Sequence, residues 1–200
     1  MAKKAGIFDL ETHFAFYGAY HRNPVNILLH TLFVWPIFFT SLMLFYFTPS
    51  IYDISQYGSL DRGGLALNFS FFFTLIYALF YVRFDKKAGT LAALLCFACW
   101  IGASFLSGWL GFSLAWKVVL AAQLFCWAGQ FLGHGMFEKR APALLDNLVQ
   151  AFLMAPFFVL LEVLEKICGY EPYPGFHERV QAKIQAEIKE CEDKKQKKSS

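Results

Sequence analysis

Residues 25–47 form a nearly continuous run of Val, Ile, Leu and Phe, and this run restricts the chain to a membrane fold. A helix of that length crosses the roughly 30 Å of hydrocarbon in a bilayer, because each residue adds about 1.5 Å. The composition agrees: 57% of the 200 residues are hydrophobic and only 16% are charged. We therefore expect an integral membrane protein whose main partner is the lipid bilayer.

Three more apolar runs follow the first, at residues 65–82, 90–110 and 113–132. Short polar or glycine-containing loops separate them, and Pro36 is expected to kink the first. The predicted fold class is therefore all-α, an integral membrane helical bundle of about four transmembrane helices.

Two further helices are expected outside these spans. Residues 6–22 read as an N-terminal amphipathic helix that Asp9 caps and Pro24 ends. Residues 143–164 are apolar but interrupted by charged and amide side chains, which favours a C-terminal interfacial or re-entrant helix over a fifth crossing. Residues 1–168 are predicted to form a single membrane-embedded domain, and residues 169–200 a cytosolic charged tail.

The positive charges predict the topology. Lys and Arg residues gather near both ends of the chain, in the loop 83–87 and at Lys139 and Arg140, so four spans place both termini in the cytosol. Lys197 and Lys198 match the dilysine retrieval signal of endoplasmic reticulum membrane proteins, although a solvated basic tail has the same composition. No basic stripe interleaves with exposed aromatics, so no nucleic acid is expected as a partner.

This topology gathers four of the five histidines at one membrane face: His13, His21, His30 and His134. For any one of them a hydrogen-bonded position at a helix end is a sufficient explanation. For the set, a shared metal ion is favoured, because polar groups are costly at this depth and imidazole binds iron, copper, zinc or nickel. Glu138 and Glu162 are the nearby carboxylates, so a mixed shell stays open, and the remaining His177 reads as a surface residue.

Two blocks of sequence carry a family resemblance: LETHFAFYGAYHRNPVNILLH at residues 10–30, and GQFLGHGMFEKRAPALLDNLVQAFLMAPFFVLLE at residues 129–162. Together they resemble the membrane 2-hydroxy fatty acid dioxygenases that turn phytosphingosine into odd-numbered fatty acids. The resemblance implies an oxidoreductase of the endoplasmic reticulum that uses Fe(2+) and O₂ to shorten a long-chain 2-hydroxy fatty acid by one carbon with release of CO₂. It also implies that the four gathered histidines are the iron ligands.

Other roles follow from the same resemblance. Basic side chains at the cytosolic rim would steer the substrate carboxylate, and tyrosines beside the histidines would donate hydrogen bonds around the metal. Positive-inside anchoring and an interfacial aromatic belt explain the same residues without any catalytic role. The candidates are Arg22, Lys139 and Arg140 for substrate binding, and Tyr17, Tyr20 and Glu138 for catalysis.

The implied reaction requires no second organic cosubstrate. A 2-hydroxy acid and O₂ give a shorter acid, CO₂ and water with all four electrons supplied by the substrate. The sequence contains no P-loop, dinucleotide fingerprint, GxSxG or HExxH motif, which is consistent with such a reaction. The alternatives are another metal-dependent membrane lipid oxidase or hydrolase, and a non-enzymatic transport or structural protein of the same membrane.

Overall fold

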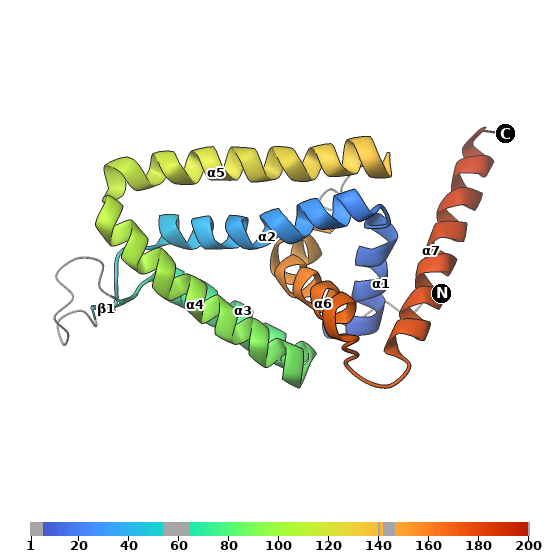
Figure 1. The fold of residues 1–200 in the computed structure, drawn as a ribbon, viewed down its shortest axis with the longest axis horizontal. Helices are drawn as coiled ribbons and strands as arrows, with labels where there is room; N and C mark the ends of the chain where they lie inside the picture. Colours follow the sequence, from blue (N-terminus) through green and yellow to red (C-terminus); the bar gives the residue numbers. More distant parts are fainter. Residues whose placement is uncertain (1–5, 54–64, 140, 142–146, 200) are drawn as a thin grey trace. The chain divides into compact units, whose positions relative to one another are not determined.

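The computed structural model describes residues 6–53, 65–139, 141 and 147–199, and it confirms the all-α fold class (Figure 1). Two-residue strands β1 (Tyr52–Asp53) and β2 (Ala66–Leu67) pair antiparallel. Two π-helical segments also occur, η2 (Gly133–Glu138) and η4 (Gln150–Met154). The helices are α1 (Leu10–Tyr20), α2 (Pro24–Phe45), α3 (Phe69–Phe84), α4 (Lys86–Leu110), α5 (Phe112–Leu132), α6 (Ala155–Cys168) and α7 (Phe176–Ser199).

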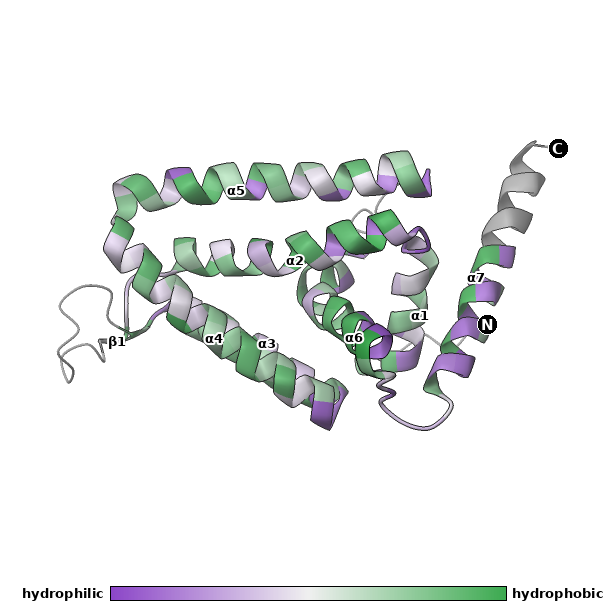
Figure 2. Ribbon diagram, viewed as in Figure 1, coloured by the Kyte–Doolittle hydropathy of each residue, from purple (hydrophilic) through white to green (hydrophobic). Residues whose placement is uncertain are grey.

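Three helices of the described chain are long and apolar enough to cross a membrane: α2, α4, and α5 continued by η2 as Phe112–Glu138. Helix α3 is as apolar but has only 16 residues. It starts later than predicted because Ala66 and Leu67 pair with β1, and because Asn68 caps the helix by accepting a hydrogen bond from the Phe71 N–H. Figure 2 shows the hydrophobic character along α2 to α5.

The chain forms two compact units, Met1–Leu29 with Phe131–Ser200, and His30–Gln130. In the second unit α3 and α4 pack side by side as a hairpin. A Cβ at Gly89 would collide with the carbonyl group of Tyr81, so glycine is required for this close approach. Cys96 is fully buried in the unit, and the four described cysteines are free.

The first unit contains α1, α6 and α7. Asp9 caps α1 as predicted, accepting hydrogen bonds from the N–H and the hydroxyl of Thr12. Phe14 of α1 packs on Phe158 of α6 and on Phe176 of α7. The buried residues of α1 lie around the helix rather than along one amphipathic stripe: Leu10, Phe14, Ala15, Tyr17, Ala19 and Tyr20. Most of the predicted charged tail forms α7, whose first turns belong to this unit, and Phe176, Val180 and Ile184 are buried there.

The segment predicted as an interfacial or re-entrant helix, residues 143–164, lies partly outside the described residues. Its described part consists of η4 followed by α6, and the Asn147 side chain accepts a hydrogen bond from the Gln150 N–H at its start. Helix α6 continues η4 without a break, and this run is not among the three described helices that are long and apolar enough to cross a membrane.

Candidate metal centre

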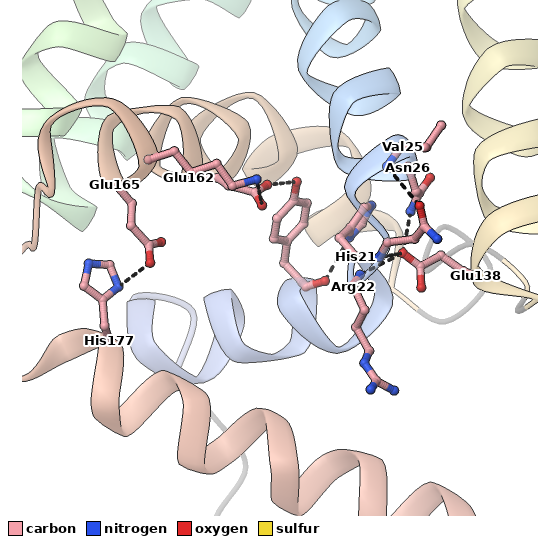
Figure 3. A network of polar contacts seen from close by, with 11 residues as sticks. His21, Arg22, Val25, Asn26, Glu138, Glu162, Glu165 and His177 are labelled. Atoms are coloured by element: carbon pink, nitrogen blue, oxygen red, sulfur yellow. Dashed lines mark hydrogen bonds and ion pairs between the residues drawn. The ribbon is translucent and has the colours of Figure 1, made fainter.

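The turn between α1 and α2 is fixed by a carboxylate from much later in the chain. Oε1 of Glu138, the last residue of η2, accepts hydrogen bonds from the main-chain N–H groups of Arg22 and Asn23, both at 2.7 Å, and from the Asn26 amide at 3.2 Å (Figure 3). The first N–H groups at a helix start have no partner within the helix, and a negative charge there is favourable. Glu138 therefore binds the start of α2 to the end of η2.

His21 is the first residue after α1, because the helix ends at Tyr20 rather than at residue 22 as predicted. Its Nδ1 lies 2.8 Å from the main-chain oxygen of Tyr17. A carbonyl oxygen can only accept, so Nδ1 carries the hydrogen, and a neutral His21 has its lone pair on Nε2. This is the common arrangement of a metal-binding histidine, in which the second ring nitrogen is held by a carbonyl or carboxylate.

His134 lies in η2, directly after α5. Its side chain is buried, and its ring centroid is 4.9 Å from that of His21. Gly133 permits this approach, since a Cβ there would collide with the side-chain oxygen of Asn26 in the first turn of α2. A π-helical turn shifts the register of the side chains that follow it, and such turns are frequent at functional sites.

His30 lies one helical turn after Asn26 on the unbroken helix α2, which contains the boundary between the units. The ring nitrogens that His21, His30 and His134 can offer lie within 4.8 Å of one another, and all three residues are buried. Three imidazoles without a cysteine suit iron, copper, zinc or nickel more than magnesium or calcium. The donor set is therefore compatible with a transition-metal ion.

The structure places His13 apart from this group. One of its ring nitrogens lies 3.1 Å from the main-chain oxygen of Gly6, and its own carbonyl accepts a 2.6 Å hydrogen bond from the Gln150 amide. A helix face shared by His13 and His21 does not form, because α1 ends before His21. The assignment of His13 as a ligand stays a prediction.

The two predicted tyrosines have different surroundings. The Tyr17 hydroxyl donates a 3.0 Å hydrogen bond to Glu162, and burial, reinforced by the Glu162 charge, raises the pKa of Tyr17 well above its usual range. Tyr17 therefore stays protonated and acts as a donor. Tyr20 is also buried, and its ring packs against Phe16 at 4.8 Å.

A cavity of about 340 Å³ opens within the first unit beside His21. Arg22, predicted to bind substrate, lies on its wall, whereas Lys139 is exposed after η2 and Arg140 lies outside the described residues. Burial, together with neighbouring Glu162, raises the pKa of Glu165 in the cavity wall, and the charge of His177 partly offsets this. Further lining residues include Tyr17, Gly18, Glu162, Lys166, His177 and Gln181.

Sequence reasoning named Glu162 as a carboxylate near the histidines but did not assign Glu165 or Lys166, which share the α6 wall of this cavity with it. Glu162, Glu165 and Lys166 recur at spacings of three and four, which places them on one helix face. That spacing was the available signal. His177, predicted as an ordinary surface residue, is less exposed than expected. It lies 3.1 Å from Glu165 (Figure 3), and 3.7 Å from Glu171.

The fold and the histidine group define a helical membrane protein with a candidate imidazole metal centre. The chain belongs to the Mpo1-like family, described as 2-hydroxy-palmitic acid dioxygenase Mpo1-like, whose model matches residues 7–167. It is similar to 2-hydroxy-palmitic acid dioxygenase MPO1 of Saccharomyces cerevisiae, with 34% identity over 183 residues that cover 92% of this chain and 91% of the yeast protein. No solved structure matches the chain.

Proposed function

We propose that this protein is an iron(II)-dependent dioxygenase that converts a long-chain 2-hydroxy fatty acid and O₂ into a one-carbon-shorter fatty acid, CO₂ and water. The observation that carries the proposal is the buried group of His21, His30 and His134 in a chain whose family and yeast relative are named for 2-hydroxy-palmitic acid dioxygenase. The reaction balances without a further reductant. Cleavage of the bond between C1 and C2 and oxidation of the hydroxyl-bearing carbon together supply the four electrons that reduce O₂.

His21, His30 and His134 would hold the iron, which when bound supplies the redox chemistry that activates O₂. The Tyr17 carbonyl keeps the His21 hydrogen on Nδ1, so that Nε2 can bind the metal. Glu138 fixes the turn that carries His21 to the helix segment that carries His134. Its three hydrogen bonds support a positioning role.

The cavity beside His21 would receive the polar head of the substrate. Its wall carries Arg22, a cation that can attract a carboxylate, and Lys166, which also pairs with Glu162. Its volume of about 340 Å³ and polar lining suit a head group better than a long acyl chain. The acyl chain would then extend toward apolar surface. Lys139, which is exposed, would add positive charge that attracts the carboxylate, and substrate binding by Arg140 stays a prediction.

We further propose that the enzyme works in the endoplasmic reticulum membrane with both termini cytosolic, in the degradation of phytosphingosine. The distribution of Lys and Arg at the loop 83–87 and in the tail supports this orientation. Protease protection of tags at each terminus in sealed microsomes tests it: tags digested without detergent agree, and protected tags contradict the orientation.

The activity is tested with the full chain purified in mild detergent, loaded with iron(II) and given 2-hydroxypalmitate and O₂. We expect stoichiometric iron, formation of pentadecanoate, and one CO₂ released for each O₂ consumed. His21→Gln should lose iron and product together, whereas His177→Gln should keep its iron. No product from the iron-loaded protein would refute the proposal, and turnover without O₂ would indicate a metal-dependent hydrolase instead.

A further inference from the structure

We propose that Glu162 is a positioning residue for the metal centre, acting on His21 through Tyr17. The inference deepens the proposed function and rests on it, since it requires that His21 binds the metal. Its basis is a chain of contacts from α6 to the end of α1, within the first unit (Figure 3).

The first contact joins Glu162 to Tyr17. The Tyr17 hydroxyl donates to Oε2 of Glu162 at 3.0 Å, although the two residues are 145 positions apart in sequence. The other carboxylate oxygen of Glu162 pairs with Lys166 at 3.1 Å, one helical turn later on α6. Glu162 thus offers the tyrosine an acceptor whose direction is fixed from its own helix.

Two further contacts, one through the main chain and one through the rings, join Tyr17 to His21. The main-chain oxygen of Tyr17 accepts from Nδ1 of His21 at 2.8 Å, and the two rings stack with centroids 4.0 Å apart and planes 19° apart. The ring of Tyr17 therefore limits the rotation of the imidazole, while its carbonyl selects the tautomer.

The Tyr17 ring is in turn held in place by its neighbours. It stacks with Phe14, packs against Phe158, and is 5% exposed. A hydroxyl in such a place requires an acceptor, because a buried hydroxyl without one is costly. Removing either the Glu162 carboxylate or the Tyr17 hydroxyl would therefore remove the hydrogen bond that fixes the rotation of the ring, and the stacked imidazole would lose its orientation.

A purely structural hydrogen bond would stabilise the fold but leave the metal unaffected. The two roles differ in what they predict for metal affinity and for the spectrum of the bound metal. Tyr173 provides a matched control, since its hydroxyl donates a 2.9 Å hydrogen bond to Glu11 in the same unit and its ring has no part in the histidine group.

The experiment titrates cobalt(II), an optical substitute for iron, into the full chain in detergent and follows visible absorption and thermal unfolding. We expect Tyr17→Phe and Glu162→Ala to weaken cobalt binding about tenfold or more and to change the absorption band. Glu162→Gln should restore most of the affinity, because its amide oxygen can still accept from Tyr17. The double variant Tyr17→Phe/Glu162→Ala should bind cobalt no more weakly than the weaker-binding of the two single variants, because each substitution removes the same hydrogen bond.

Tyr173→Phe should lower the unfolding temperature slightly and leave cobalt affinity and absorption unchanged. The inference is overturned if Tyr17→Phe, folded and near wild-type in unfolding temperature, binds cobalt with wild-type affinity and absorption. A different result would indicate failure of the proposed metal centre itself: a wild-type chain that binds no cobalt, or a His21→Gln variant that binds it unchanged. Tyr17→Phe decides the question even if Glu162→Ala does not fold.

Discussion

The two units of the molecule use polar side chains in different ways. In the second unit, Gln123 and Ser107 bind main-chain carbonyls of α2, and Thr74 binds a carbonyl of its own helix. These neutral groups satisfy helix backbones in an apolar setting. In the first unit, carboxylates bind partners from distant parts of the chain, as Glu138 does at Arg22 and Glu162 at Tyr17.

This contrast indicates which part of a small membrane protein can carry chemistry. Buried charged groups are costly unless they are paired, so a unit that concentrates them needs a compensating use. The cavity, the carboxylates Glu138 and Glu162, and two of the three clustered histidines belong to the first unit, and His30 directly follows its boundary on α2. Substitutions in the histidine group and at the carboxylates that support it should therefore alter metal binding and turnover, whereas substitutions of the neutral polar side chains in the second unit should alter stability alone.

The largest effect is expected from His134→Gln. Loss of one imidazole from a three-histidine site should remove iron from the purified protein and lower turnover by at least about 100-fold, beyond the range for residues that only support a ligand. Iron content and pentadecanoate formation are the measurements. Gln123→Leu, in the second unit, should keep its iron. Loss of iron in this variant would contradict the view that the neutral polar side chains of the second unit serve stability alone.

His13 sharpens the same test, because sequence and structure differ about it. As an iron ligand, His13 should behave like His134 when replaced by Gln. Its place beside the Gly6 carbonyl, outside the group of three nitrogens, leads us to expect retained iron and a smaller loss of turnover. Equal iron loss in both variants would restore His13 to the ligand set.

Much of the fold was predictable from local signals. The apolar runs gave the membrane helices, and Asp9 and Pro24 marked the start of α1 and the start of α2. The end of α1 at Tyr20 and the π-helical η2 were not predictable. Both depend on contacts such as Glu138 with Arg22, 116 positions apart, and no spacing rule along the chain encodes a contact of that range.

Glu138→Ala should have the second largest effect. It removes a charged acceptor from three donors at the start of α2, and each such bond contributes roughly 1.5–3 kcal/mol, so we expect a loss of about 3 kcal/mol or more in the free energy of unfolding. Glu138→Gln should lose less, since one oxygen still accepts. Thermal unfolding in detergent measures the stability of both variants. Equal stability of Glu138→Ala and wild type would refute the role of Glu138 in holding the start of α2 to the end of η2.

Two glycines of η2 give a matched pair of smaller effect. An alanine Cβ at Gly133 would collide with the Asn26 side chain, whereas a Cβ at Gly135 meets no atom within 4 Å. We expect Gly133→Ala to lose about 1–3 kcal/mol by overpacking and to weaken metal binding, and Gly135→Ala to stay within about 0.5 kcal/mol of wild type. Thermal unfolding in detergent measures both variants, and equal unfolding temperatures would contradict the close contact between Gly133 and Asn26.

The smallest effect concerns the attachment of α7 to α1 by Glu11, which pairs with Lys183 at 2.8 Å and Arg179 at 3.0 Å. Hydrogen bonding to Lys183, helped by Tyr173 and Arg179 and opposed by burial, lowers the pKa of Glu11 below 4.5. A carboxylate whose pKa is lower in the folded state stabilises the fold at pH values above its pKa in the unfolded chain. That stability is lost as the pH falls through the pKa of the folded state.

Glu11→Gln should therefore cost about 1 kcal/mol near neutral pH, or ~2–4 °C in unfolding temperature. The difference from wild type should shrink as the pH falls below 4.5, while cobalt affinity at neutral pH stays unchanged. A difference that persists in acid would mean that Glu11 holds α7 by packing rather than by charge.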